Sequence, residues 1–273
     1  MTPASEPAAH YDWTAFALSL SCTMLVVSVL LGVTFVVALR LGRHSVVDVA
    51  WGLGFVAIAA TSYVLSSGYG DGGRRLLVLI LTGAWGLRLA VHIGRRSVGH
   101  GEDPRYEELM SKAASRPKLF ALRRIYLTQG LVMLFVSLPV QVAAFENVRL
   151  GVVAWAGAVI WLFGFGFEAI GDHQLGRFRN DPTSKGKVLD TGLWRYTRHP
   201  NYFGDACVWW GLSLIAFSAW PGILTIVSPI VMTWLLVKGT GKPLLEKDIT
   251  SRRPGYADYV RRTSGFLPLP RAR

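Results

Sequence analysis

Seven polar or charged side chains interrupt long apolar stretches of the sequence and are its first candidates for chemistry. They are Asp48, Arg88, His92, Glu168, Asp172, Asn201 and Asp205. Six of them form pairs spaced by four residues, so each pair shares one helix face. Because charges inside a membrane mark function or internal pairing, we expect these faces to line one polar pocket open to the cytosol. The alternative is that Arg88 pairs with Asp48 or Glu168 and only locks helices together.

The segment from Gly192 to Asp205 is the densest in polar groups. Pro200 suits the first turn of a helix, and free amides there, with Arg195 and Arg198 beside them, would bind an anion. Asn201 and Asp205 follow one turn apart and can accept hydrogen bonds from hydroxyl or amide groups. Phosphate together with ribose or amide is what a nucleotide cofactor presents. The alternative is that the arginines anchor a helix at anionic lipid headgroups, which would leave Asn201 and Asp205 unexplained.

Membrane-spanning helices must position these residues. The chain is 51% hydrophobic and only 17% charged, with a mean hydropathy of +0.36, whereas soluble domains carry about 25% charged residues. A span needs about 20 apolar residues. We therefore expect an all-α polytopic membrane helix bundle of six or seven spans, with seven favoured, at residues 14–39, 46–66, 76–94, 125–145, 150–170, 205–220 and 222–238. Trp220-Pro221-Gly222 is a turn or a kink between the last two.

The basic residues set the orientation. With the N-terminus outside and the C-terminus inside, 25 of the 29 Lys and Arg residues fall in inside segments and three in outside turns, as the positive-inside rule requires. The net charge of +12 thus follows membrane topology, and a nucleic-acid partner is not expected. We expect a single membrane domain over 1–273, with an external tail at 1–12, cytosolic loops at 95–124 and 173–199, and a cytosolic tail at 239–273. A short helix is expected around Tyr106–Ala114.

Cysteine and histidine usage excludes two other classes of site. Cys22 and Cys207 both lie in apolar runs, so a disulfide framework is not expected. The six histidines show no paired ligand spacing, so no metal is expected.

Arg198-His199-Pro200-Asn201-Tyr202-Phe203-Gly204-Asp205 resembles the hallmark of the membrane steroid 5α-reductase and sterol C14/C7-reductase superfamily. The chain is more closely similar to the bacterial uncharacterised branch of the 5α-reductase C-terminal domain family. The stretches that carry this likeness begin at Asp48-x-x-Trp51-Gly52, Trp85-Gly86-Leu87-Arg88, Gly101-Glu102-Asp103-x-Arg105-Tyr106 and Gly255-Tyr256. The resemblance implies a seven-helix bundle in the bacterial inner membrane, with NADPH bound from the cytosol and an apolar membrane lipid as substrate.

The resemblance also assigns roles to residues. Asp172 and Arg179 match a family Asp and Arg that touch the nucleotide, and Asn201 and Asp205 match positions beside the nicotinamide. Arg88 matches an arginine that contacts phosphate, and the Leu244–Lys247 stretch should close the site. The cofactor-binding residues expected in all are Arg88, Asp172, Arg179, Arg198, His199, Asn201, Tyr202 and Asp205.

The proton donor is where the sequence departs from the animal 5α-reductases. Their Gln-Glu pair is absent, Asp48 lies in the comparable region, and Trp85 falls near the place of their proton-donating Tyr. Asp48 is therefore our candidate for the acid or carbonyl-polarising group, since burial can keep a carboxyl protonated.

The expected function is reduction by NADPH of a C=C bond in a steroid-, isoprenoid- or fatty-acyl-like lipid. One alternative is an S-adenosylmethionine-dependent lipid or isoprenylcysteine-type methyltransferase, because such enzymes share Arg-His-Pro-x-Tyr-x-Gly; Glu246 could serve that function. Another is a non-catalytic lipid-binding scaffold, against which the buried charges argue.

Overall fold

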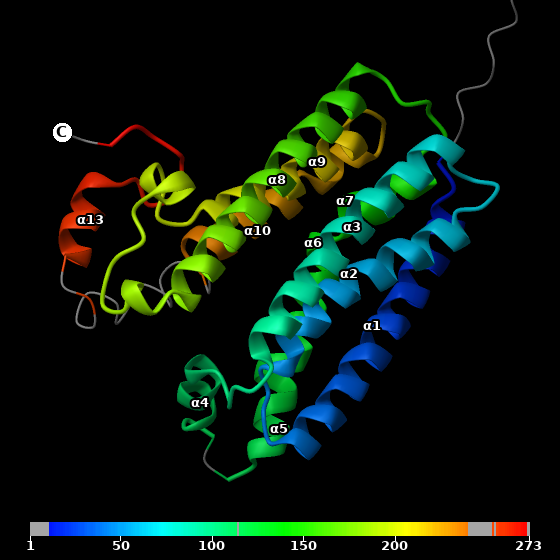
Figure 1. Cartoon of the computed structure of the whole chain (residues 1–273). Coiled ribbons are helices and arrows are strands. Elements are labelled where there is room, and N and C mark those ends of the chain that lie inside the picture. Colours follow the sequence, from blue (N-terminus) through cyan, green and yellow to red (C-terminus); the bar gives the residue numbers. More distant parts are fainter. Residues whose placement is uncertain (1–10, 114, 240–252, 254, 272–273) are drawn as a thin grey trace, which may run out of the picture. The chain divides into compact units, whose positions relative to one another are not determined.

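The chain is helical in the part that the computed structural model describes, which is residues 11–113, 115–239, 253 and 255–271. Within those ranges, Thr197 and Ser264 pair their backbones in an isolated β-bridge. Figure 1 shows the elements in order, which are α1 (Trp13–Leu41), α2 (Val46–Leu65), α3 (Gly72–Ser97), α4 (Pro104–Met110), α5 (Pro117–Ala121), η1 (Leu122–Leu127), α6 (Thr128–Val136), α7 (Leu138–Phe145), α8 (Val152–Asn180), η2 (Pro182–Ser184), η3 (Gly192–Arg195), α9 (Pro200–Phe217), η4 (Gly222–Ile226), α10 (Val227–Val237) and α13 (Tyr256–Arg262).

The prediction of an all-α polytopic membrane bundle is confirmed. Among the described residues, five helical stretches are long and apolar enough to cross a membrane, and these are Trp13–Leu41, Val46–Leu65, Gly72–Ser97, Pro117–Val136 and Val152–Asn180. The last two predicted spans correspond to α9 and to the shorter apolar stretch Gly222–Val237. The Trp220–Gly222 segment is a turn between them.

Two helices extend beyond the apolar stretches that predicted them. α8 continues to Asn180, where Arg177 and Arg179 lie in its last turn and interact favourably with the negative end of the helix dipole. α9 begins at Pro200, five residues before the predicted span, because proline is well suited to the first helical position. Residues 1–10 of the external tail expected at 1–12, and the Leu244–Lys247 stretch, lie outside the described residues.

The chain divides into two compact units, and each is described by itself. The first unit is Met1–Trp155 with Leu212–Ser228, and the second is Ala156–Gly211 with Pro229–Arg273. Helices α8, α9 and α10 each supply residues to both units. The prediction of a single membrane domain stays a prediction.

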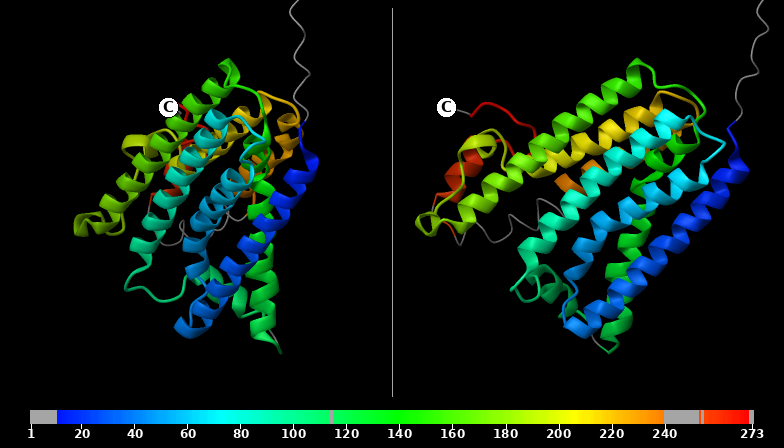
Figure 2. Two further views of the ribbon diagram at one scale, coloured as in Figure 1. Left: turned by 90° about the vertical axis from the view of Figure 1, so that its right-hand side faces the viewer. Right: turned by 45° about the vertical axis from the view of Figure 1, so that its right-hand side comes forward.

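In the first unit, α1, α2 and α3 lie side by side (Figures 1 and 2). Glycines allow α2 and α3 to approach closely, since a Cβ on Gly52 would lie 2.4 Å from the carbonyl oxygen of Gly86. Such small-residue contacts are the usual means of packing helices in lipid. Phe55 and Trp85 then fill the core, with ring centroids 5.4 Å apart and no exposed surface.

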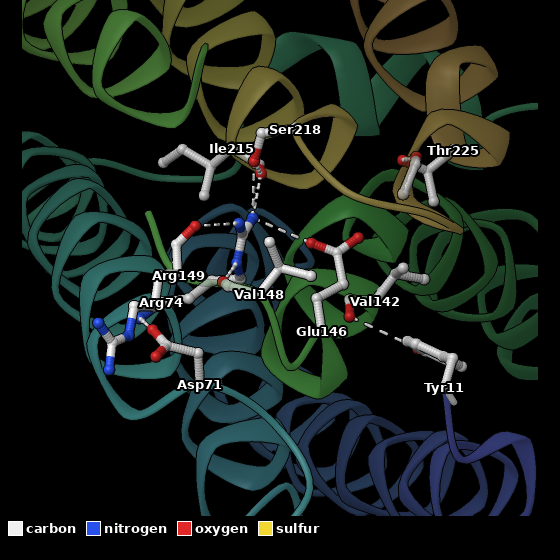
Figure 3. Close-up of polar contacts among 11 residues, drawn as sticks. Tyr11, Asp71, Arg74, Val142, Glu146, Val148, Arg149, Ile215, Ser218 and Thr225 are labelled. Carbon is white, nitrogen blue, oxygen red and sulfur yellow. Dashed lines mark hydrogen bonds and ion pairs between the residues drawn. The ribbon is translucent and has the colours of Figure 1, made fainter. Parts of the chain in front are cut away.

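A buried arginine at the start of α3 connects this helix to the turn after α7 and to the end of α9. Figure 3 shows Arg74 paired with Glu146 at 3.0 Å, and both side chains are fully buried. The Arg74 guanidinium also donates to the carbonyl of Val148 at 3.0 Å and to the carbonyl of Ile215. The start of α3, the turn after α7 and the end of α9 are thereby held at one point.

In the second unit, α8 and α9 pack through glycines that recur every seven residues. A Cβ on Gly164 would lie 2.6 Å from the carbonyl oxygen of Gly204, and one on Gly211 would lie 2.6 Å from that of Gly157. Gly171 extends this α8 row and lies against Pro200. The backbones are therefore in contact along the row, which fixes the register of the two helices.

This packing predicts opposite effects for two alanine substitutions in α8. Gly164→Ala would meet backbone atoms of α9 and should lower the stability by about 1–3 kcal/mol. Gly166→Ala is the matched control, since a Cβ there meets nothing within 4 Å and gains helix propensity. Thermal unfolding of the purified protein in detergent measures both. Equal stability of the two variants would contradict the close approach of α8 and α9.

Candidate functional site

Asp48 is the centre of a polar cluster in the first unit. It lies in the first turn of α2 with 24% of its side chain exposed. The phenol of Tyr106 donates to its Oδ1 at 2.6 Å, and Nη2 of Arg105 donates to its Oδ2 at 2.9 Å. Both carboxylate oxygens are therefore engaged by groups that come from α4, more than fifty residues along the chain.

The local sequence explains why α4 presents these groups. Asp103 caps the helix by accepting from the backbone N of Arg105, and Pro104 occupies the first helical position, where no N–H is needed. The Asp103 carboxylate also accepts a hydrogen bond from Nε of Arg105 at 2.9 Å, which fixes the guanidinium. Arg105 is thus held between Asp103 and Asp48.

Glu102 attaches this segment to α2. Its carboxylate accepts from the backbone N–H groups of His44 and of Ser45, the residue just before α2. These N–H groups have no intrahelical partner, so the Glu102 carboxylate satisfies them. Its negative charge also interacts favourably with the positive end of the helix dipole. The Glu102 hydrogen bonds therefore form a second link between the start of α2 and the segment that leads into α4, which helps to position Asp48 and Tyr106.

The surroundings of Tyr106 keep its phenol protonated. Its side chain is buried, and Nε2 of Gln129 in α6 donates to its oxygen at 3.3 Å. Burial, and then the negative charge of Asp48, raise the pKa of Tyr106 well above its ordinary value. Burial also acts to raise the pKa of Asp103, but the hydrogen bonds from Arg105 outweigh it and hold that pKa below its ordinary value.

Sequence reasoning found Asp48 but missed the residues around it. It offered Arg88 as the ion-pair partner of Asp48, whereas the structure pairs Asp48 with Arg105. Arg88 and His92 are both half-buried on α3. Tyr106 and Gln129 were not considered as site residues. The signal that could have found Tyr106 is the Gly101–Tyr106 stretch, which carries three charges directly before a tyrosine.

The second unit brings together the other predicted residues where α8 ends and α9 begins. A Cβ on Gly204 would meet the backbone of Glu168, and one on Gly171 would lie 3.2 Å from the backbone N of Asn201. The two i, i+4 pairs therefore lie on neighbouring turns. Glu168, Asp172 and Asp205 are buried. That these residues share a pocket with Arg88 and His92 stays a prediction.

Arg198 holds the C-terminal segment of the second unit. Its Nη1 donates to the carbonyls of Val260 and Thr263, at 3.2 and 2.6 Å, and the side chain is buried. The hydroxyl of Tyr259 donates to the carbonyl of Trp194 at 2.6 Å in the same region. These contacts give Arg198 a structural role, and its expected role in cofactor binding remains a prediction.

The remaining hallmark residues differ in accessibility. His199 is buried and stacks on the half-buried Tyr202, with ring centroids 5.4 Å apart. Arg179 and Arg195 are exposed. Asp172 and Arg179 are both on α8, seven residues and so about two turns apart.

This donor set fits a nucleotide in part. The carboxylates of Asp172 and Asp205 and the amide of Asn201 could accept from ribose hydroxyls or a carboxamide, while the exposed arginines could meet phosphates. No group of three or more His, Cys, Asp or Glu side chains that could hold a metal occurs among the described residues.

Loss of Arg198 should release the C-terminal segment. Arg198→Ala leaves two carbonyls without their donor, which costs about 1–3 kcal/mol, so chymotrypsin should cut faster after Tyr256 and Tyr259. Arg195→Ala removes the same charge from an exposed position and should leave cleavage unchanged. If both variants are cut like the wild type, Arg198 does not anchor this segment.

The pKa of Tyr106 gives a spectroscopic prediction. Because the folded-state pKa is raised, the phenol keeps its proton at pH 10.0, the ordinary tyrosine value. The tyrosinate absorbance at that pH should therefore be the same in the wild type and in Tyr106→Phe, while both proteins remain folded by circular dichroism. A lower absorbance in the variant would mean that Tyr106 ionises normally.

Comparisons with known proteins place this chain in a family. The family described as "Protein of unknown function (DUF1295)" matches residues 34–263. The chain is also 24% identical to the uncharacterized protein C594.04c of Schizosaccharomyces pombe over 95% of its own length and 81% of that protein's. No solved structure matches it. Since the match spans most of the chain, including Asp48, Tyr106 and the segment around Asp205, the protein belongs to the DUF1295 family, which is a steroid 5α-reductase-like family.

Proposed function

We propose that the protein is an NADPH-dependent reductase of a C=C bond in a steroid-, isoprenoid- or fatty-acyl-like membrane lipid. The observation that carries this proposal is the hydrogen bond of 2.6 Å between Tyr106 and Asp48 at the start of a membrane-spanning helix. Reduction of a polarised double bond needs a proton at one carbon or at its conjugated carbonyl, and this pair can supply it.

The proton is held between two oxygens. A phenol that donates to a carboxylate makes a short, strong hydrogen bond, and the phenol is the group of higher pKa. We propose that Tyr106 turns this proton to the substrate, with Asp48 orienting the phenol beforehand. The charge left behind is offset by Arg105, whose guanidinium contacts Asp48 and lies 5.8 Å from the ring of Tyr106.

We propose that the cofactor is held by residues of the second unit. NADPH would supply the hydride for the other carbon. In our proposal Asp172, Asn201 and Asp205 bind its hydroxyl and amide groups. Arg179 binds a phosphate, and His199 and Tyr202 form the wall behind Asn201, while Arg198 acts through the segment it anchors. The expected role of Arg88 in binding phosphate stays a prediction. We propose that the site faces the cytosol of a bacterial inner membrane, because the basic helix ends are expected on that side.

The leading alternative is methyl transfer from S-adenosylmethionine. The Arg-His-Pro-x-Tyr-x-Gly stretch suits it equally, but methyl transfer adds no proton to its acceptor and has no need of a buried proton donor. The Tyr106–Asp48 pair therefore favours reduction. A lipid-binding scaffold is disfavoured, because a buried phenol that donates its proton to Asp48 would serve it no chemical purpose.

Binding distinguishes these functions before any substrate is known. The full-length protein in lipid nanodiscs should bind NADPH, and Asp205→Ala should weaken that binding by roughly tenfold to a hundredfold, since a charged hydrogen bond is lost. S-adenosylmethionine should not bind. Binding of S-adenosylmethionine in place of NADPH would support the methyltransferase, and binding of neither would support the scaffold.

Turnover tests the proton donor. Tyr106→Phe should lower kcat with a lipid enone by about 10²–10⁴-fold, the usual loss of a general acid, and should leave the Kd for NADPH unchanged. Tyr126→Phe is the matched control, because Tyr126 is a buried phenol of the same unit that hydrogen-bonds to His44 at 3.0 Å. An equal loss of kcat in the two variants would show that packing, and not proton transfer, is measured.

A further inference from the structure

A groove between α1 and α2 is separate from the polar cluster around Asp48. It has a volume of about 280 Å³ and is lined by the second half of α1 and the first half of α2. Its walls are Leu30 and Val37 of α1 and Val46 and Leu53 of α2, and Arg43 and Ser97 line it as well. The groove is thus apolar over most of its length and carries a cation from the segment between the helices.

The groove opens on a different side of α2 from Asp48. Val46, Val49, Ala50 and Leu53 line it at the spacing of one helix face. Asp48 is two residues from Val46 and from Ala50, which places it about 160° around the helix from each. Neither Asp48 nor Tyr106 lines the groove, so we do not assign it as the substrate site of the proposed reductase.

Arg43 is fixed in a way that leaves donors available. Its Nη1 donates to the carbonyl of Ser97 at 3.2 Å and to the carbonyl of His100. Within the described part of the chain, its Nε and Nη2 make no hydrogen bond to protein, and the side chain is half-buried. The guanidinium is thus held in place, with two N–H-bearing nitrogens left to bind an anion.

Size and charge together indicate the ligand. A volume of about 280 Å³ is just below the roughly 300–1,000 Å³ typical of pockets for drug-sized ligands, and the walls are mostly apolar, so a single acyl chain fits better. Arginine binds phosphate oxygens through two parallel N–H groups, and anionic lipids gather at basic helix ends. An acyl chain with a phosphate at one end matches both halves of the groove.

We propose that this groove binds one anionic phospholipid, with an acyl chain along α1 and α2 and the phosphate on Arg43. The lipid replaces bulk lipid at the junction of α1 and α2 and bridges α1, α2 and the end of α3. The site is independent of the proposed reductase activity and would exist in a methyltransferase or a scaffold as well.

Photolabelling tests the proposal on the full-length protein. The protein is placed in phosphatidylcholine nanodiscs that contain a small fraction of phosphatidylglycerol or phosphatidylcholine, each with a diazirine on its acyl chain. Labelling of the peptides that contain Leu30–Val37 and Val46–Leu53 should be roughly tenfold stronger with phosphatidylglycerol. Equal labelling by the two lipids would overturn the proposal, as would displacement of the phosphatidylglycerol by inorganic phosphate, which would mean a site for phosphate alone.

Two matched pairs of variants locate the site. Arg43→Gln should reduce phosphatidylglycerol labelling to the phosphatidylcholine level, while Arg40→Gln, which removes an exposed charge three residues away, should not. Val37→Phe should fill the groove and exclude the chain, while Val36→Phe, exposed on the same helix but outside the groove, should not. Because Val37→Phe leaves the contacts of Arg43 intact, it decides the question even if Arg43→Gln does not fold. Equal losses within either pair would overturn the proposal.

Discussion

A carboxylate at the start of a membrane-spanning helix has to be paired, and the pairing of Asp48 determines how one end of the first unit is built. Arg105 neutralises it and Tyr106 donates to it, and both come from the first turn of α4. The neighbouring acidic residues serve this arrangement, because Asp103 fixes Arg105 and Glu102 attaches the segment to α2. Removing Asp48 would leave a buried phenol and a held guanidinium without their shared acceptor.

The Arg74–Glu146 pair shows that a buried charge need not mean chemistry. Arg74 is fully buried and its guanidinium donates to backbone carbonyls as well as to Glu146. Its N–H groups hydrogen-bond to residues that hold helix ends together, so they are not available to bind a ligand. Asp48 differs because its partner Tyr106 carries a transferable proton. The two clusters therefore differ in whether they hold a transferable proton, and burial alone does not show which of them could be catalytic.

Apolar length predicted the fold class and the places of the spans, because the bilayer imposes both. Helix ends were less predictable, since α8 and α9 continue through polar residues that apolar length does not count. The glycines of α8 were not used to predict packing, and their seven-residue spacing does not by itself identify α9 as the helix packed against them. Within the candidate site, Asp48 stood out as a charge in an apolar stretch, whereas its hydrogen bond to Tyr106 spans 58 residues and has no periodic signal. Arg198 was predicted to bind an anion. The sequence does not indicate its partners, the carbonyls of Val260 and Thr263, because they lie more than sixty residues later.

The central claim is that hydride and proton reach a lipid double bond from two sources, the cofactor and the Tyr106–Asp48 pair. The most direct measurement is the fate of isotope in the product when the full-length protein in nanodiscs is supplied with a lipid enone in ordinary water and with NADPH in which both hydrogens at C4 are deuterium. The account predicts a saturated product that carries one deuterium from the cofactor and one hydrogen from water. A product without cofactor deuterium, or a methylated lipid formed when S-adenosylmethionine replaces NADPH, would contradict it.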